Sequence, residues 1–179
     1  KSFCSGHIKV GDMKFHCWNK LGHGSVNVID AIARSCDVFF YEIALKTGIN
    51  NIAKISREFG LGLPTGLNLP GEKGGLIPDR EWKLREKQTV WRPGETIIAG
   101  IGQGYVLVTP MQLALMTARI ANGGKKIIPT LIKSDGKILN NFSNAAISKD
   151  NLNIIKRAME KVTLDEFGTG RTFLLGNKV

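Results

Sequence analysis

Three cysteines and one histidine are grouped near the start of the sequence, at Cys4, Cys17, His23 and Cys36. Three thiolates and one imidazole complete a tetrahedral zinc shell, which leaves no coordination position for water. Glycines on both sides of His23 would let its side chain reach inward from a tight turn. These residue types therefore predict a structural zinc site. His7 and His16 are weaker candidates for the imidazole ligand.

The spacing of the cysteines leaves two other arrangements open, because it matches neither a zinc knuckle nor a Cys-x-x-Cys ribbon. One disulfide with a free thiol agrees with the odd number of cysteines. Three unrelated buried cysteines agree with the hydrophobic character of the side chain. We favour zinc, because it contributes roughly 10–16 kcal/mol of apparent binding energy in small structural sites. Residues 1–24 show no clean hydrophobic period and would depend on such a site.

A glycine-rich turn with Gly100, Gly102 and Gly104 precedes a clearly marked helix start. Thr109 suits the N-cap and Pro110 suits the first helical position. Apolar residues then recur at helical spacing, at Leu113, Met116 and Ile120. The glycine spacing does not fit a phosphate-binding loop, and no Gly-Lys-Ser/Thr follows it.

The remaining pattern predicts short helices joined by loops. Ser35-Cys36-Asp37 falls at the joint between the first two helices, and 62–78 is a long loop rich in glycine and proline. A hairpin is expected over 127–139, with its turn at Asp135-Gly136. The fold class is therefore mainly α with a minor β hairpin. The helices are expected over 28–33 with Asn27 as N-cap, over 38–45, from Asn50 or Asn51 to Gly60, over 79–86, and after Ser148.

The amino-acid composition indicates a folded globular domain but does not identify a binding partner. The 179 residues are 42% hydrophobic, which is typical of a folded domain, and no apolar run approaches the length of a membrane span. The net charge of +10 would favour an anionic partner, but the basic residues are scattered. A small zinc-stabilised basic module that binds nucleic acid or another anionic partner is therefore the alternative function. The sequence has neither an initiator methionine nor a signal peptide, so we expect an internal piece of a larger protein.

Four motifs in order resemble the transpeptidase domain of class B penicillin-binding proteins, in particular the penicillin-binding protein 2 branch. The motifs are Gly22-His23-Gly24, Ser35-Cys36-Asp37 with the apolar run that follows it, the glycine turn with Thr109-Pro110, and Gly168-Thr169-Gly170. Each is weak alone, but the four together are specific and extend over essentially the whole chain. The resemblance implies the helical part of the α/β penicillin-recognising serine transpeptidase (β-lactamase-like) fold.

The resemblance also implies an activity and two catalytic residues. The family cross-links peptidoglycan as a D,D-transpeptidase through an acyl-serine intermediate, and β-lactams are its inhibitors. Ser35 matches the serine of the second family motif, whose hydroxyl relays protons. Asp37 matches the third position of that motif, where a carboxylate pairs with a lysine or accepts a substrate N–H. Expected partners are peptidoglycan stem peptides, β-lactams and proteins of the inner-membrane cell-elongation complex, with no nucleic acid.

The metal and the location follow from the same resemblance. Relatives bind zinc with Asp, Asp, His and Cys at the matching positions, so Cys4 and Cys17 would replace the two aspartates. Cys36 would then anchor the motif between its two catalytic positions. No organic cofactor is expected. The protein would act at the periplasmic face of the inner membrane, with its membrane anchor outside this chain.

The sequence departs from the family at the first and third motifs. Ser134-Asp-Gly-Lys137 is Ser-x-x-Lys by letter only, because it falls on a predicted hairpin turn. Lys46-Thr47-Gly48 falls at a predicted helix C-terminus rather than on a strand. We therefore expect 1–179 to be a partial transpeptidase domain that lacks the upstream Ser-x-x-Lys segment and the downstream Lys-Thr/Ser-Gly strand. Such a piece would be inactive alone. A regulatory, catalytically empty homologue is the third alternative.

Overall fold

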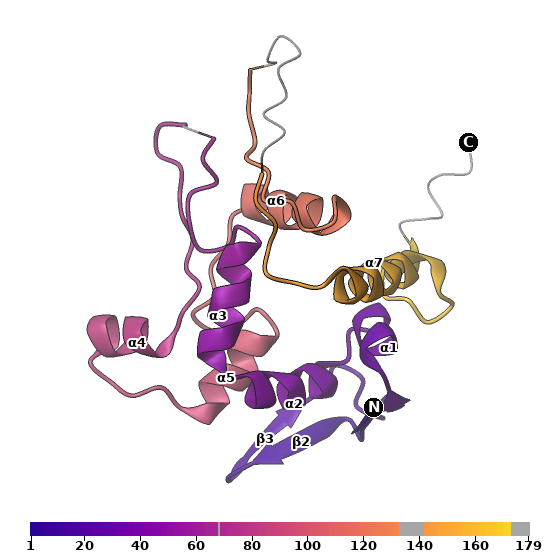
Figure 1. Cartoon of the computed structure of the whole chain (residues 1–179). Helices are drawn as coiled ribbons and strands as arrows, with labels where there is room; N and C mark the ends of the chain where they lie inside the picture. Colours follow the sequence, from indigo (N-terminus) through magenta and orange to yellow (C-terminus); the bar gives the residue numbers. More distant parts are fainter. Residues whose placement is uncertain (68, 133–141, 173–179) are drawn as a thin grey trace. The chain divides into compact units, whose positions relative to one another are not determined.

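The computed structural model describes residues 1–67, 69–132 and 142–172 (Figure 1). These residues form two compact units, one of 1–47, 92–101 and 153–172, and the other of 48–67, 69–91, 102–132 and 142–152. No helix in this part of the chain is long and apolar enough to cross a bilayer.

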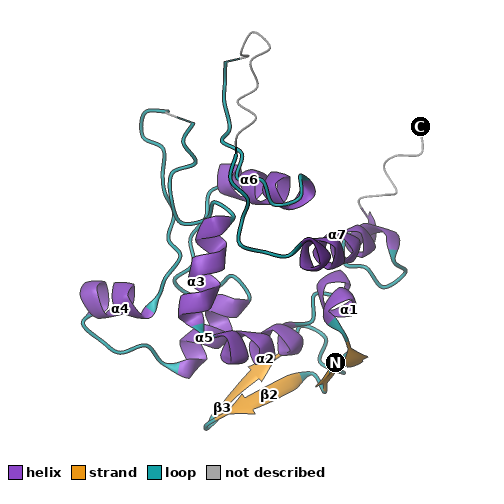
Figure 2. Ribbon diagram, in the orientation of Figure 1, coloured by secondary structure: helices purple, strands orange, loops and turns teal. Residues whose placement is uncertain are grey.

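The described residues are mainly helical, as expected for the helical part of a larger α/β fold (Figure 2). Both the fold class and the joint between the first two helices are confirmed. The helices are α1 (Val28–Ala33), α2 (Asp37–Thr47), α3 (Ile49–Glu58), α4 (Arg80–Lys87), α5 (Pro93–Gly100), α6 (Pro110–Ala121) and α7 (Lys149–Leu164).

Residues 1–24 show no clean hydrophobic period, and no regular structure is predicted there, but the segment does form strands. Residues 1–26 contain four short strands, β1 (Ser2–Cys4), β2 (His7–Val10), β3 (Met13–His16) and β4 (Gly24–Val26). β2 and β3 form an antiparallel hairpin, and β1 pairs antiparallel with β4. Strands of three or four residues are too short to show an alternating pattern, so tight turns rather than periodicity define them.

The hairpin expected over 127–139 is not found in the residues that can be checked. Residues 127–132 are not in a strand, and 133–139, including the Asp135-Gly136 turn, lie outside the described residues. A single antiparallel bridge pairs Lys125 with Asn144 on either side of this segment. The minor hairpin of the fold is therefore β2–β3 in the first unit.

Most of the expected helix starts are confirmed by their capping bonds. Oδ1 of Asn27 accepts the backbone N–H groups of Ile29 and Asp30 at 2.8 and 3.0 Å, and Thr109 and Gln112 form a capping box at α6. The expected cap at Asn50 or Asn51 is wrong, because α3 already begins at Ile49. Gly48, with φ of +76°, ends α2 and begins α3 within one residue.

The glycine-rich turn serves two physical purposes. Gly100 lies where α5 packs on α2, and a Cβ there would come within 2.4 Å of the Ala44 Cβ. Gly102 and Gly104 instead adopt φ values of +77° and +73°, which favour glycine. Ile97 of α5 is fully buried in the same core as Val38 and Phe39 of α2. α5 therefore contributes to the same buried core as the residues on either side of the α1–α2 joint.

The second unit has its own small core and a buried polar clamp. Phe59, Ala145 and Leu152 are buried together, with Met116 and Ile120 of α6 packed against them. The fully buried Gln112 amide donates to the backbone carbonyls of Leu63 and Gly74, both at 2.7 Å. Two hydrogen bonds from Gln112 of α6 thus hold the long loop over 62–78 at Leu63 and at Gly74.

Candidate metal cluster and catalytic motif

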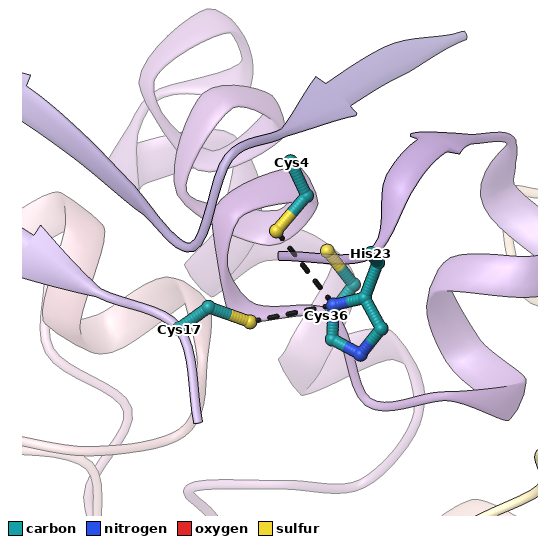
Figure 3. A group of neighbouring side chains, drawn as sticks. All are labelled: Cys4, Cys17, His23 and Cys36. Atoms are coloured by element: carbon teal, nitrogen blue, oxygen red, sulfur yellow. Dashed lines mark hydrogen bonds between the residues drawn. The ribbon is translucent and has the colours of Figure 1, made fainter. Parts of the chain in front are cut away.

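The four predicted metal ligands converge in the first unit (Figure 3). Each comes from a different local element: Cys4 from the end of β1, Cys17 from just after β3, His23 from just before β4, and Cys36 from just before α2. All three cysteines are buried and none is in a disulfide, so the disulfide alternative is absent from this structure. One ligand atom from each residue lies within 4.8 Å of the others.

The two sulfur-to-nitrogen distances known for this group fit a tetrahedral metal shell. Zinc bonds of about 2.3 Å to sulfur and about 2.0–2.1 Å to nitrogen place tetrahedral sulfur and nitrogen ligands about 3.6 Å apart. Nδ1 of His23 lies 3.6 Å from the Cys4 sulfur and 3.5 Å from the Cys17 sulfur. The donor set and its spacing therefore suit zinc. The other ring nitrogen, Nε2, points away from the sulfurs (Figure 3) and is buried with no hydrogen-bond partner among the described residues.

Burial controls the protonation of this cluster in the absence of a metal. It raises the pKa of the Cys36 thiol to about 12, and it also raises the pKa of Cys17. Burial lowers the pKa of the His23 imidazole, and the Arg34 charge adds to that effect. Burial thus favours the neutral imidazole that a metal requires, and it favours the protonated thiols of Cys17 and Cys36 until a cation displaces their protons.

Ser35 has an unusual backbone conformation at the end of α1. Its φ is +52°, in the left-handed region that ordinarily takes glycine. The Ser35 N–H donates to the Ile32 carbonyl at 3.2 Å, and the Cys36 N–H donates to the Ala31 carbonyl at 2.9 Å. These two bonds define a Schellman motif whose glycine position holds a serine. A strained serine at such a position is the kind of outlier that marks functional sites.

The turn at the end of α1 points the side chains of Ser35 and Cys36 in different directions. Cys36 is fully buried and points into the cluster, whereas Ser35 is exposed. The Asp37 carboxylate accepts the backbone N–H of Trp18 through Oδ2 at 2.8 Å. Because Trp18 directly follows Cys17, the loop that supplies a cluster sulfur also orients this carboxylate. The Trp18 indole N–H donates to the Arg34 carbonyl at 3.0 Å and closes the loop onto α1.

Ser35 and Asp37 open onto one surface depression of about 350 Å³. Apolar groups form the rest of its lining: Ile32, Phe40, Gly100 and Ile101. The two residues predicted to be catalytic therefore face the same space. Such a depression combines a hydroxyl and a carboxylate on an apolar floor, which suits proton transfer and hydrogen bonding to a polar ligand.

The weaker candidate residues lie elsewhere. His7 and His16 pair across β2 and β3 with ring centroids 6.0 Å apart, outside the group of four. Lys46 and Thr47 are in the last turn of α2, which confirms the prediction that this Lys-Thr-Gly lies at the end of a helix rather than on a strand. Ser134 and Lys137 lie outside the described residues.

Two contacts of the motif could not be found by sequence reasoning. One is the bond from Trp18 to Asp37. The other is a 3.0 Å contact between the hydroxyls of Ser35 and Thr169, which are 134 residues apart. The Gly168-Thr169-Gly170 sequence was the only available signal for the second contact, and it marked a turn rather than a partner for Ser35.

A family model and similar curated proteins point to the same protein family. The model of the penicillin binding protein transpeptidase domain matches residues 1–179. The peptidoglycan D,D-transpeptidase MrdA of Acinetobacter baumannii is 39% identical over 171 residues, which cover 92% of this chain and 25% of that protein. The chain thus spans about a quarter of the length of the curated relatives that it matches.

Solved structures agree with this match. Pseudomonas aeruginosa PBP2, in complex with WCK 5153, has a TM-score of 0.88 and 39% identity over 96% of this chain and 39% of its own. Helicobacter pylori PBP2, in a complex with MreC, has a TM-score of 0.90 and 36% identity over 99% of this chain and 33% of its own. The fold of the described residues is therefore that of the helical part of a penicillin-binding transpeptidase.

Proposed function

Because the chain belongs to the penicillin-binding protein transpeptidase domain family, we propose that the whole protein is a peptidoglycan D,D-transpeptidase. It would cross-link stem peptides through an acyl-serine intermediate and would be acylated by β-lactams. The observation that carries this proposal is the joint opening of Ser35 and Asp37 onto one depression at the α1–α2 joint. No observation on the described residues favours the small basic binding module.

In this account the chain supplies the second family motif to a centre completed outside it. The exposed Ser35 hydroxyl would pass its proton toward the departing amine and take one from a neighbouring ammonium group. Asp37, held by the Trp18 N–H, would accept a hydrogen bond from the substrate or pair with a lysine. The nucleophile would be the serine of a Ser-x-x-Lys motif outside these residues. The single match by letter here, Ser134-Asp-Gly-Lys137, falls on a predicted turn and does not qualify.

Labelling by a fluorescent penicillin tests the proposal. We expect the whole protein to form a stable covalent adduct at a serine outside residues 1–179. Ser35→Ala should slow acylation by about 10²–10⁴-fold, the usual range for loss of a proton-transfer group. Ser56→Ala, in α3 of the other unit, is the matched control and should react at the wild-type rate. An adduct on a serine of this chain, or no adduct in the folded wild type, would contradict the proposal.

We further propose that Cys4, Cys17, His23 and Cys36 hold a structural zinc. The support is the convergence of three buried thiols and an imidazole, with two sulfur-to-nitrogen distances that match those of a tetrahedral shell. Zinc bound by four protein ligands supplies rigidity rather than a reactive water. Cys36 would hold the backbone between Ser35 and Asp37, and Cys17 would hold the loop whose next residue binds the Asp37 carboxylate.

Location and partners follow from the relatives as proposals. We propose that the whole protein acts at the periplasmic face of the inner membrane, where its substrate is assembled, within a cell-elongation complex. The Helicobacter pylori relative was solved in a complex with MreC, which supports a partner of that kind. Co-purification of the tagged whole protein with the MreC of the same organism tests this, and failure to recover MreC after mild crosslinking would count against it.

A further inference from the structure

The Gly168-Thr169-Gly170 loop after α7 reaches back to the end of α1. The Thr169 N–H donates to the Ala33 carbonyl at 3.0 Å, and the Thr169 hydroxyl lies 3.0 Å from the Ser35 hydroxyl. Ala33 is the last residue of α1, so its carbonyl has no partner within the helix. A loop distant in sequence thus completes the helix end on which Ser35 is mounted.

The loop that carries Thr169 is held rigidly by α7. The Gly170 N–H donates to the Val162 carbonyl at 2.8 Å. A Cβ on Gly168 would come within 2.4 Å of that same carbonyl oxygen, so only glycine permits this close approach. At the other end of the loop, the Arg34 guanidinium stacks on the Phe167 ring at 4.8 Å from its centroid. The position of the Thr169 hydroxyl is therefore set by both helices.

The contacts of Thr169 favour one direction for its hydrogen bond with Ser35. A threonine hydroxyl has one hydrogen to donate and two lone pairs to accept with. Its oxygen lies 3.4 Å from the Ala33 carbonyl, which can only accept. When Thr169 donates to that carbonyl, Ser35 must donate to Thr169 across the 3.0 Å contact. The lone pairs of Ser35 are then left for a donor in the depression that it lines with Asp37.

We propose that Thr169 is a positioning residue for Ser35. Its hydroxyl fixes the rotamer and the hydrogen-bond direction of the Ser35 hydroxyl, so that the Ser35 oxygen is ready to accept a hydrogen bond from a neighbouring ammonium group. This inference rests on the proposed transpeptidase function. It assigns the orientation of the Ser35 hydroxyl to a residue outside the second motif, in the loop after α7.

A double-mutant cycle on the whole protein tests the proposal. The variants are Thr169→Val, which keeps the shape but removes the hydroxyl, and Thr169→Ser, which keeps the hydroxyl. Each is combined with wild-type Ser35 and with Ser35→Ala, and the second-order rate of acylation by a fluorescent penicillin is measured. The backbone bond from Thr169 to Ala33 is retained in every variant, so the cycle isolates the side chain.

We expect Thr169→Val to slow acylation about tenfold, the equivalent of one lost hydrogen bond, with an unchanged melting temperature. Thr169→Ser should stay within about threefold of wild type by the same measure. In the Ser35→Ala background, Thr169→Val should have no further effect, because Thr169 acts through Ser35. An equal loss in both backgrounds, or no loss in either, would overturn the positioning role while leaving the proposed function intact. A folded wild type that is not acylated would overturn both.

Discussion

The backbone N–H of Trp18 donates a 2.8 Å hydrogen bond to the Asp37 carboxylate, one residue after Cys17, which contributes a sulfur to the cluster of Cys4, Cys17, His23 and Cys36. The cluster therefore touches the second family motif twice, through Cys36 within it and through the Trp18 N–H beside it. A change in the cluster should for this reason be felt at Asp37 as well as in overall stability.

Replacing Asp37 separates its charge from its hydrogen bond. Asp37→Asn keeps an oxygen that accepts the Trp18 N–H, so the variant should melt at the wild-type temperature. Asp37→Ala leaves that N–H without its acceptor and should lower the free energy of unfolding by about 1 kcal/mol. Penicillin acylation should fall further in Asp37→Ala than in Asp37→Asn. Equal melting temperatures and equal rates in the two variants would show that the hydrogen bond is unimportant.

The left-handed backbone at Ser35 predicts an unusual pair of variants. Ser35→Ala and Ser35→Gly both remove the hydroxyl, so both should lose acylation. Glycine adopts a φ of +52° without the steric cost of a Cβ, so Ser35→Gly should be more stable than Ser35→Ala by about 1 kcal/mol. Chemical denaturation of the two proteins measures the difference. If alanine were the more stable residue, Ser35 would not be strained.

Close packing of α5 on α2 predicts a steric effect at Gly100. Gly100→Ala places a methyl group within 2.4 Å of the Ala44 Cβ and should destabilise the protein by about 1–3 kcal/mol in urea unfolding. Adding Ala44→Gly removes the opposing methyl group and should recover part of the loss, less the roughly 1 kcal/mol that glycine costs within a helix. A double variant no more stable than Gly100→Ala alone would refute the steric explanation.

The ion pair between Glu58 and Lys126 in the second unit predicts a pH dependence. A 2.6 Å bond from the Lys126 ammonium is the main cause that holds the pKa of the Glu58 carboxyl below its usual value near 4.5. A carboxyl with a lowered folded-state pKa stabilises the fold above its unfolded pKa, and this contribution is lost as the pH falls through the folded value.

Wild type should therefore be more stable than Lys126→Met at pH 7, by at most about 1 kcal/mol because both groups are partly exposed. The difference should shrink as the pH is lowered from about 4.5 and vanish once Glu58 is protonated in the folded state. Denaturant midpoints of both proteins across this range provide the test. A difference of constant size would show that the lysine acts by packing rather than by charge.

Sequence reasoning succeeded where a local signal determines local structure. Asn27, Thr109 and Ser148 mark helix starts because a side-chain oxygen next to an apolar period satisfies N–H groups within the next turn. It failed for α5, whose residues include Pro93, Gly94 and Gly100. That helix forms because Ile97 is buried against α2, and tertiary packing outweighs a poor local propensity.

The site shows the same division. The four cluster residues could be grouped from their types, but their spacing left a disulfide and three unrelated buried cysteines open, and only the structure brings the four side chains together. The partner of Ser35 could not be found, because Thr169 comes from the opposite end of the chain. The Trp18 bond uses a backbone N–H, which leaves no trace in the type of residue.

Elemental analysis of the whole protein, purified without chelators, tests most directly whether a metal holds the Ser35–Asp37 motif in place. We expect one zinc per chain in the wild type, less than a tenth of that in Cys36→Ser, and unchanged zinc content in Ser35→Ala. Zinc absent from folded wild-type protein that still reacts with penicillin would contradict this expectation.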